Sequence, residues 1–157
     1  MRSRQRAAAL AGALLLASAA APACELVLSE HRSGRELARL PLDAAQPAVR
    51  VVFTHSVLGT PVEDLYRWRH DGRGWRAHLV QERYEGEGYG LPNAAGRGET
   101  LQRDGAGWRL PLDPVVHPLV LPPVPGMRVA TGDRVPLALR DLSHRSIELR
   151  AAGCPTP

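Results

Sequence analysis

Residues 49–66 read VRVVFTHSVLGTPVEDLY and contain two apolar runs separated by a break with glycine and proline. In the first run Val51 and Phe53 lie two positions apart, the spacing that turns side chains to one face of a strand. Gly59 and Pro61 favour a turn, after which the strand-like pattern resumes. The stretch therefore predicts a β-hairpin with one face against a core.

The period of two recurs along the rest of the chain, where short apolar runs alternate with glycine-containing turns. No amphipathic stretch after residue 23 is long enough to form a stable helix. The segment from Pro111 to Pro125 holds six prolines, so we expect an extended edge or crossover segment there. The predicted fold class is all-β, a single antiparallel β-sandwich or small barrel of about eight to ten short strands. These strands are expected near residues 25–29, 36–40, 49–55, 62–69, 74–84, 99–103, 108–112, 128–130, 134–140 and 146–151.

The N-terminus has the three parts of a secretory signal peptide. Arginines precede an apolar run rich in Ala and Leu, and Ala21-Pro22-Ala23 provides a small-x-small cleavage site. We therefore divide the chain into a signal peptide, residues 1–23, cleaved after Ala23, and a single β domain, residues 24–157. The expected localisation is periplasmic or secreted, with membrane contact only through an uncleaved signal or a lipid.

The two cysteines, Cys24 and Cys154, lie at the two ends of the predicted mature domain. A cysteine pair in an exported protein is most simply interpreted as a disulfide. Cys24 would also be the first mature residue, where a bacterial lipoprotein carries its acylated cysteine, but Ala21 stands where that signal has a bulky aliphatic residue. A lipid and a disulfide compete for one sulfur, and we favour the disulfide.

The formal net charge of +4 includes the three arginines of the signal peptide, so the mature domain carries +1. This balance excludes a nucleic-acid-binding protein that depends on a strong basic patch. The composition indicates no cofactor.

The turn of the hairpin is the first candidate site, because it places an imidazole, hydroxyls and carboxylates close together. His55 extends the apolar face of its strand, so it is either a buried core histidine or a functional one. Glu63 would return across the hairpin toward it, and a His beside a carboxylate suits a ligand contact, a metal ligand or a general base. Ser56 projects to the opposite face, which argues against a nucleophile–base pair. No His-x-His or Cys-x-x-Cys spacing supports a metal site.

A second candidate is the polar strand end and glycine-rich loop at residues 82–92, which read ERYEGEGYGLP. Glycines at alternate positions permit left-handed backbone and the close approach of a partner. The acidic side chains would repel phosphate, so the segment is either a binding loop or a tight turn with a solvated acidic rim. Near the C-terminus, His144 precedes the last strand and is expected at the same end of the domain.

On these residues the chain resembles the bacterial DUF1850 family. The resemblance implies a small exported or membrane-tethered bacterial protein, often encoded beside a tripartite ATP-independent periplasmic (TRAP) transporter of the TAXI type, and it implies no biochemical activity. The matching residues are His55-Ser56-Val57, Thr60-Pro61-Val62-Glu63, Tyr66, Glu82, Tyr84, Gly88, Gly90, Leu91, Pro92 and His144.

The first hypothesis is a non-enzymatic accessory or binding domain that contacts the transporter permease or its solute-binding protein, or that holds a small anionic ligand. It involves no catalytic residue, metal or cofactor. The alternative is a cell-envelope hydrolase or metal-dependent enzyme that uses His55 and Glu63, and a third interpretation makes the turn a structural staple. The residues expected to line the contact site are His55, Ser56, Thr60, Glu63, Tyr66, Glu82, Tyr84 and His144, with Gly88, Gly90 and Pro92 in the loop.

Overall fold

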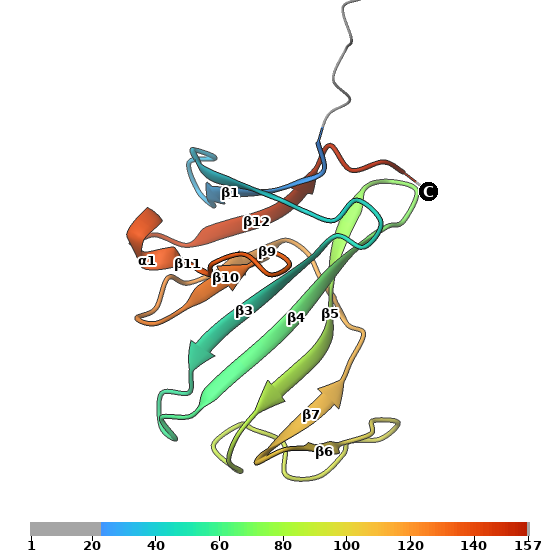
Figure 1. The fold of residues 1–157 in the computed structure, drawn as a ribbon, viewed down its shortest axis with the longest axis vertical. Coiled ribbons are helices and arrows are strands. Elements are labelled where there is room, and N and C mark those ends of the chain that lie inside the picture. The colour runs from blue at the N-terminus through green and yellow to red at the C-terminus, as the bar shows by residue number, and fades with distance from the viewer. Residues whose placement is uncertain (1–22, 157) are drawn as a thin grey trace, which may run out of the picture.

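The computed structural model describes residues 23–156, which form two packed antiparallel sheets (Figure 1). The predicted all-β class and its sandwich-like arrangement are confirmed. The smaller sheet has the strand order β2 (Glu36–Pro41), β1 (Glu25–Glu30), β12 (Ile147–Ala152), β9 (Leu119–Leu121). The larger sheet has the order β11 (Leu137–Ala138), β10 (Arg128–Ala130), β3 (Ala48–Thr54), β4 (Pro61–His70), β5 (Trp75–Tyr84), β7 (Gly107–Pro111), β6 (Gln102–Asp104), and β8 (Val115–Val116) pairs with β5.

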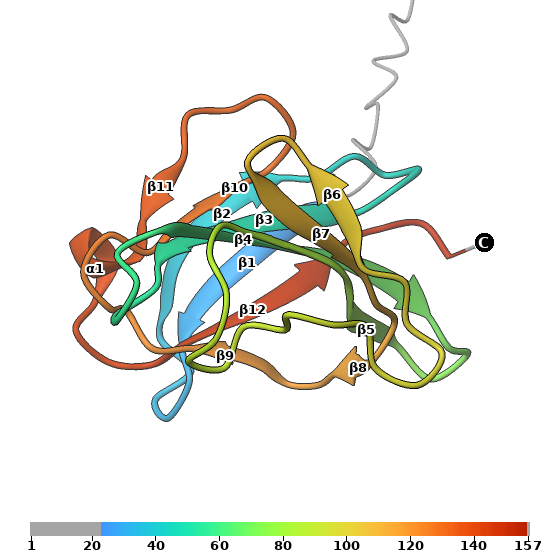
Figure 2. The same cartoon turned by 90° about the horizontal axis from the view of Figure 1, so that it is seen from below.

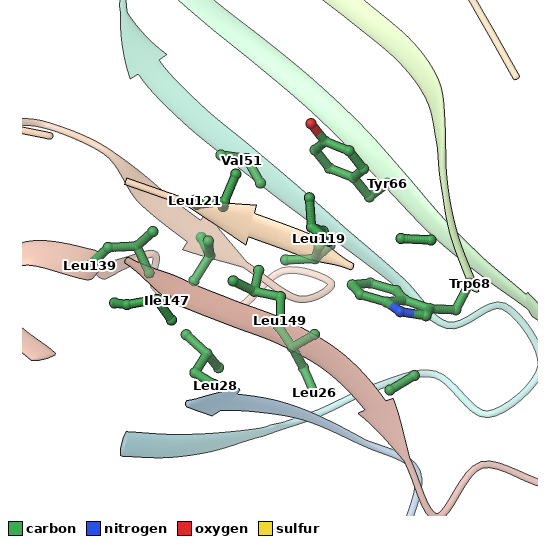
Figure 3. Packing of buried hydrophobic residues seen from close by; sticks show 14 of the residues in the cluster. Leu26, Leu28, Val51, Tyr66, Trp68, Leu119, Leu121, Leu139, Ile147 and Leu149 are labelled. Atoms are coloured by element: carbon green, nitrogen blue, oxygen red, sulfur yellow. The ribbon is translucent and has the colours of Figure 1, made fainter. Parts of the chain in front are cut away.

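The main core lies between the two sheets, where alternate side chains of both meet (Figure 3). Leu26 and Leu28 of β1 are fully buried, as is Ile147 of β12 on the next strand of the same sheet. Val51 and Trp68 belong to the same cluster and come from β3 and β4 of the larger sheet. Burial of each such side chain contributes roughly 1.5–3 kcal/mol, which makes this cluster the main source of stability.

A disulfide joins Cys24 to Cys154 and confirms the predicted pairing. The two cysteines flank β1 and β12, which pair with each other from Glu25 opposite Ala152. In this structure the Cys24 sulfur is therefore bonded within the protein and is not free for a lipid thioether.

The larger sheet extends beyond the smaller one, so a different segment covers its far end (Figure 1). A second apolar cluster lies there and contains Val62, Tyr84 and Leu110. Leu91 and Leu101, from the connection between β5 and β6, pack against this cluster. We call this connection, residues 85–101, the cover loop, and Figure 2 shows it crossing the open end between the sheets.

The proline-rich segment leaves the larger sheet through β8 and reaches the outer edge of the smaller sheet as β9. It is a crossover with edge strands, as predicted, because proline cannot donate to a sheet ladder.

The predicted strand at residues 134–140 is wrong. The structure has only the short β11 there, followed by a single helical turn, α1 (Leu139–Leu142). Val135 is 91% exposed while Leu139 is fully buried, so the alternate apolar residues do not share one face. Pro136 cannot donate to a ladder, and the Leu139 amide instead donates to the Met127 carbonyl.

The predicted signal peptide, residues 1–23, lies outside the described residues except for Ala23. Among residues 23–156, no helix has the length and apolar character needed to cross a membrane.

Candidate functional site

His55 connects the β3–β4 turn to the cover loop. Its Nδ1 accepts hydrogen bonds from the backbone N–H groups of Val57 at 3.3 Å and Leu58 at 3.2 Å. Because Nδ1 accepts, the proton of the neutral ring lies on Nε2, which donates to the Tyr89 carbonyl at 3.2 Å. Strand β3 ends at Thr54, so His55 is a half-buried turn residue and not an extension of the apolar strand face.

Backbone hydrogen bonds close the β3–β4 turn, and a second side chain of the turn bonds to the cover loop. The His55 amide donates to the Thr60 carbonyl at 2.8 Å, and the Gly59 amide donates to the His55 carbonyl at 2.9 Å. The Thr60 hydroxyl donates to the Glu85 carbonyl at 2.7 Å. Ser56 is exposed in this turn and takes no part in the junction.

The tip of the cover loop has a left-handed backbone that presents a tyrosine. Gly88 and Gly90 have positive φ angles of 82° and 97°, and Tyr89 between them has a φ of 53°. A non-glycine residue in this region is uncommon and is held there by its surroundings, here by the His55 bond to its carbonyl. The Tyr89 side chain is 73% exposed, and Val57 in the neighbouring turn is 61% exposed.

The base of the cover loop is fixed to β5. The Tyr84 hydroxyl donates to the Pro92 carbonyl at 2.8 Å, and the Tyr84 ring belongs to the second apolar cluster. Burial raises the pKa of Tyr84, and the carboxylates of Glu82 and Glu99 raise it further. Tyr84 therefore acts here as a neutral hydrogen-bond donor.

Acidic and phenolic side chains, two of them buried and one half-buried, lie together on the inner face of the larger sheet. Asp64 of β4 is 9% exposed and stands directly opposite Glu82 of β5. The Tyr66 hydroxyl lies 3.4 Å from Asp64 Oδ2, a long contact, and the buried Oδ1 has no hydrogen-bond partner among residues 23–156. We call Asp64, Tyr66 and Glu82 the acid seam.

The ionisation of the acid seam is shifted toward the neutral forms. Burial, followed by the charge of Glu82, raises the pKa of Asp64 to about 7. Burial also raises the pKa of Glu82, with a further contribution from Glu99 in the cover loop. The pKa of Tyr66 is raised by burial and by Asp64. A buried carboxyl with an unpaired oxygen beside a second carboxyl is a typical feature of functional sites.

Two predicted site residues lie elsewhere. Glu63 alternates with Asp64, so it faces the outer surface, where its carboxylate is 3.7 Å from Arg50. The predicted pair of His55 and Glu63 is therefore not formed. His144 is exposed between α1 and β12, in an open cleft of about 760 Å³ that Glu30 also lines.

Glu30 organises that separate region. It is 6% exposed and accepts hydrogen bonds from Arg35 at 2.6 Å, Ser33 at 2.9 Å and Ser143 at 3.0 Å. The Arg35 guanidinium, followed by the Ser33 hydroxyl, lowers the pKa of Glu30 to about 2. Glu30 thus fastens the β1–β2 turn to the segment after α1, which is a structural role.

The structure thus unites most of the predicted site and adds to it. His55, Thr60, Glu82 and Tyr84 lie at one end of the larger sheet together with the predicted loop residues Gly88, Gly90 and Pro92. Tyr66 lies further along β4, in the main core. Asp64 was not predicted as a site residue. Its alternation with Val62 and Tyr66, which both face the core, indicates that its carboxyl points inward. Within residues 23–156, no group of three or more His, Cys, Asp or Glu side chains is arranged to hold a metal ion.

Comparison with known proteins identifies one family. The model of a domain of unknown function, DUF1850, matches residues 49–132. No curated protein and no solved structure matches the chain. The matched span runs from β3 through β10 and contains the hairpin turn, the acid seam and the whole cover loop.

Proposed function

We propose that this chain, which belongs to the DUF1850 family, is a non-enzymatic accessory or binding protein of the bacterial cell envelope that contacts a TAXI-type TRAP transporter. The contact surface is formed by the β3–β4 turn and the tip of the cover loop. The resemblance to the family suggests the transporter as the partner, and the geometry of the two loops suggests the contact surface.

The observation that carries the non-enzymatic assignment is the use of both ring nitrogens of His55. A general base must have a nitrogen free to reach a substrate proton. In His55 one nitrogen accepts from two backbone amides of the turn, and the other donates to the Tyr89 carbonyl. Its neighbours also differ from those of a catalytic His, because Glu63 lies on the other face of the sheet and Ser56 is exposed. The enzyme alternative based on His55 and Glu63 has no support from this geometry.

The hydrogen bonds of His55 also fix the contact surface before a partner binds. Tyr89 and Val57 are exposed, and His55 fixes the backbone of both segments. Tyrosine provides a large flat contact area with few rotatable bonds, which is why it is frequent among residues that dominate binding energy. Fixing the loops before binding lowers the entropy lost on association.

The charge of this end of the molecule favours a protein partner over a small anion. Glu85, Glu87 and Glu99 lie in the cover loop, and Glu82 lies on β5 beneath it. These carboxylates would repel a small anionic ligand. The permease or the solute-binding protein is therefore the preferred partner at this site.

Co-purification with the two transporter components, expressed one at a time, tests the proposal. Tyr89→Asn is the informative variant, because Asn tolerates the left-handed backbone while it removes the ring. Loss of a central tyrosine should weaken binding about thirtyfold, equivalent to roughly 2 kcal/mol. Val135→Asn, which removes an exposed apolar side chain from a different loop, is the matched control and should bind like the unmodified protein.

Three results would count against the proposal. They are no binding to either component, equal binding by both variants, and hydrolysis of a cell-envelope substrate that disappears in His55→Asn. Tyr89→Asn must keep the unmodified melting temperature for its binding result to count in favour.

A further inference from the structure

The acid seam lies at the junction of two differently covered parts of the larger sheet. On β4 the inward residues Tyr66 and Trp68 belong to the main core under the smaller sheet, whereas Val62 belongs to the second cluster under the cover loop. Asp64 lies between them on the same face. A change in its charge therefore acts where the cover loop meets the main core.

The seam carries two acidic groups, and no basic side chain of residues 23–156 shifts the pKa of either. Asp64 and Glu82 are direct cross-strand partners, a position in which like charges destabilise a sheet. The groups that act on Asp64 are Glu82, the Tyr66 hydroxyl and Glu63, and the carboxylate that acts on Glu82 is Glu99. Every charged group among them is acidic. Asp64 is buried and Glu82 opposite it is half-buried, so ionisation of both carboxyls is unfavourable and uptake of one positive charge relieves it.

The unpaired oxygen of Asp64 gives independent support for this conclusion. Asp64 Oδ1 is buried without any hydrogen-bond partner in the described part of the chain. An ionised oxygen in that position would lose its hydration without compensation. A protonated carboxyl there removes the charge and gains a donor that can reach the opposing carboxylate of Glu82.

The cover loop is the element that can respond. Its polar ties to the sheet and the turn are the bonds of Tyr84 to Pro92, His55 to Tyr89 and Thr60 to Glu85. Leu91 and Leu101 add apolar contacts to the second cluster. Glu99, which belongs to the loop, acts on Glu82, so negative charge in the seam repels the loop directly.

We propose that the acid seam is a proton-binding site that keeps the cover loop closed. With one proton shared by Asp64 and Glu82, residues 85–101 stay packed on Val62 and Leu110. When both carboxyls are ionised, their repulsion of Glu99 and their need for water open the loop and expose the second apolar cluster. This inference goes beyond the proposed function, because it concerns the protein alone and holds whatever the loop contacts.

A proton fits the seam better than a metal ion or an organic cation. A metal site needs several converging ligands, and no group of three acidic, His or Cys side chains in residues 23–156 is so arranged. Asp64 Oδ1 is itself buried, so a larger cation cannot reach it from solvent while the loop is closed.

Hydrogen–deuterium exchange on the purified protein tests the proposal. Protection of amides 86–101, corrected for intrinsic exchange and compared with the amides of β1 and β12, is measured at about pH 5.5 and about pH 8. Since burial raises the pKa of Asp64 to about 7, the protection factors of the loop should fall about tenfold at the higher pH. Asp64→Asn, which cannot ionise, should keep the loop equally protected at both pH values.

The control is Asp133→Asn, which removes one carboxyl from an exposed turn and should retain the full pH effect. Unchanged protection in the unmodified protein, or the same fall in Asp64→Asn, would overturn the proposal. Restoration of protection at the higher pH by magnesium, calcium or spermidine would also overturn it, because the seam would then bind a cation other than a proton. A folding defect in Asp64→Asn would appear as lost protection in β1 and β12, and Glu82→Gln then provides the second test. It removes the charge opposite Asp64 but leaves Asp64 able to ionise, so the fall in loop protection at the higher pH should be smaller than in the unmodified protein, and an unchanged fall would overturn the proposal.

Discussion

Replacement of Asp64 by Asn should stabilise the protein at alkaline pH and leave its stability unchanged in acid. The pKa of Asp64 rises from 3.8 to about 7 on folding, chiefly through burial. Because the folded state binds the proton more tightly, stability is highest below the unfolded pKa and is lost as the pH rises toward the folded pKa. At 1.36 kcal/mol per pH unit, the full loss is about 4 kcal/mol. Asn has the same shape but no charge, so it avoids this loss.

Opening of the cover loop limits the effect, because a solvated Asp64 no longer bears the full cost of burial. The expected gain of Asp64→Asn over the unmodified protein at about pH 8 is therefore positive but smaller than about 4 kcal/mol, and it should vanish near pH 4. Urea unfolding of both proteins across this range measures the difference, in which the contributions of other titrating groups cancel. Asp133→Asn controls for net charge and should show no pH-dependent gain. A constant difference between Asp64→Asn and the unmodified protein at every pH would refute the reasoning, since it would show that Asp64 is ionised alike in the folded and unfolded states.

Two further predictions concern the elements that hold the site. His55→Ala should lower the free energy of unfolding by roughly 1–3 kcal/mol, because it removes an acceptor for two turn amides and a donor to the Tyr89 carbonyl. His55→Asn should recover part of that loss, since Asn can accept from the turn amides but is too short to reach the loop, and urea unfolding compares the two. Reduction of the bond between Cys24 and Cys154, 130 residues apart, should cost about 5 kcal/mol in the chain-entropy model, measured by the same method with and without reductant. An unchanged urea midpoint after verified reduction would contradict this estimate.

The strands of the fold are predictable from the sequence because their signals are local. Alternation of apolar residues and glycine turns locates β1, β2, β3, β4, β5 and β12 to within one or two residues. The exception at residues 134–140 has a physical cause. Val135 and Leu139 have the spacing of a strand, but Pro136 lies between them and α1 begins at Leu139, so one strand face does not continue through this segment. Sequence alone also leaves the order of strands undetermined, since β12 pairs with β1 and β10 with β3 across long stretches of chain.

The site is less predictable because it depends on which face each residue takes. His55 and Glu63 are close in sequence and suggest a pair, yet Asp64, one position later, carries the inward carboxyl. The contact of His55 with Tyr89 joins two loops, and no periodicity relates residues so far apart. His144 resembles a site residue by type, but the chain places it near Glu30 in another region.

The family match covers the strands and loops that form the candidate site, but not all of the strands that support it. Residues 49–132 include the turn, the seam and the cover loop, whereas β1, β2 and β12 lie outside this span. These outer strands cannot be dispensable, because Leu26, Leu28 and Ile147 cover the inner face of the larger sheet and β4 runs continuously from that core into the seam. The disulfide and Glu30 hold the outer strands in place from their two ends. The part of the larger sheet that the smaller sheet covers thus fixes the position of Asp64, and the part that only the cover loop covers can respond to its charge.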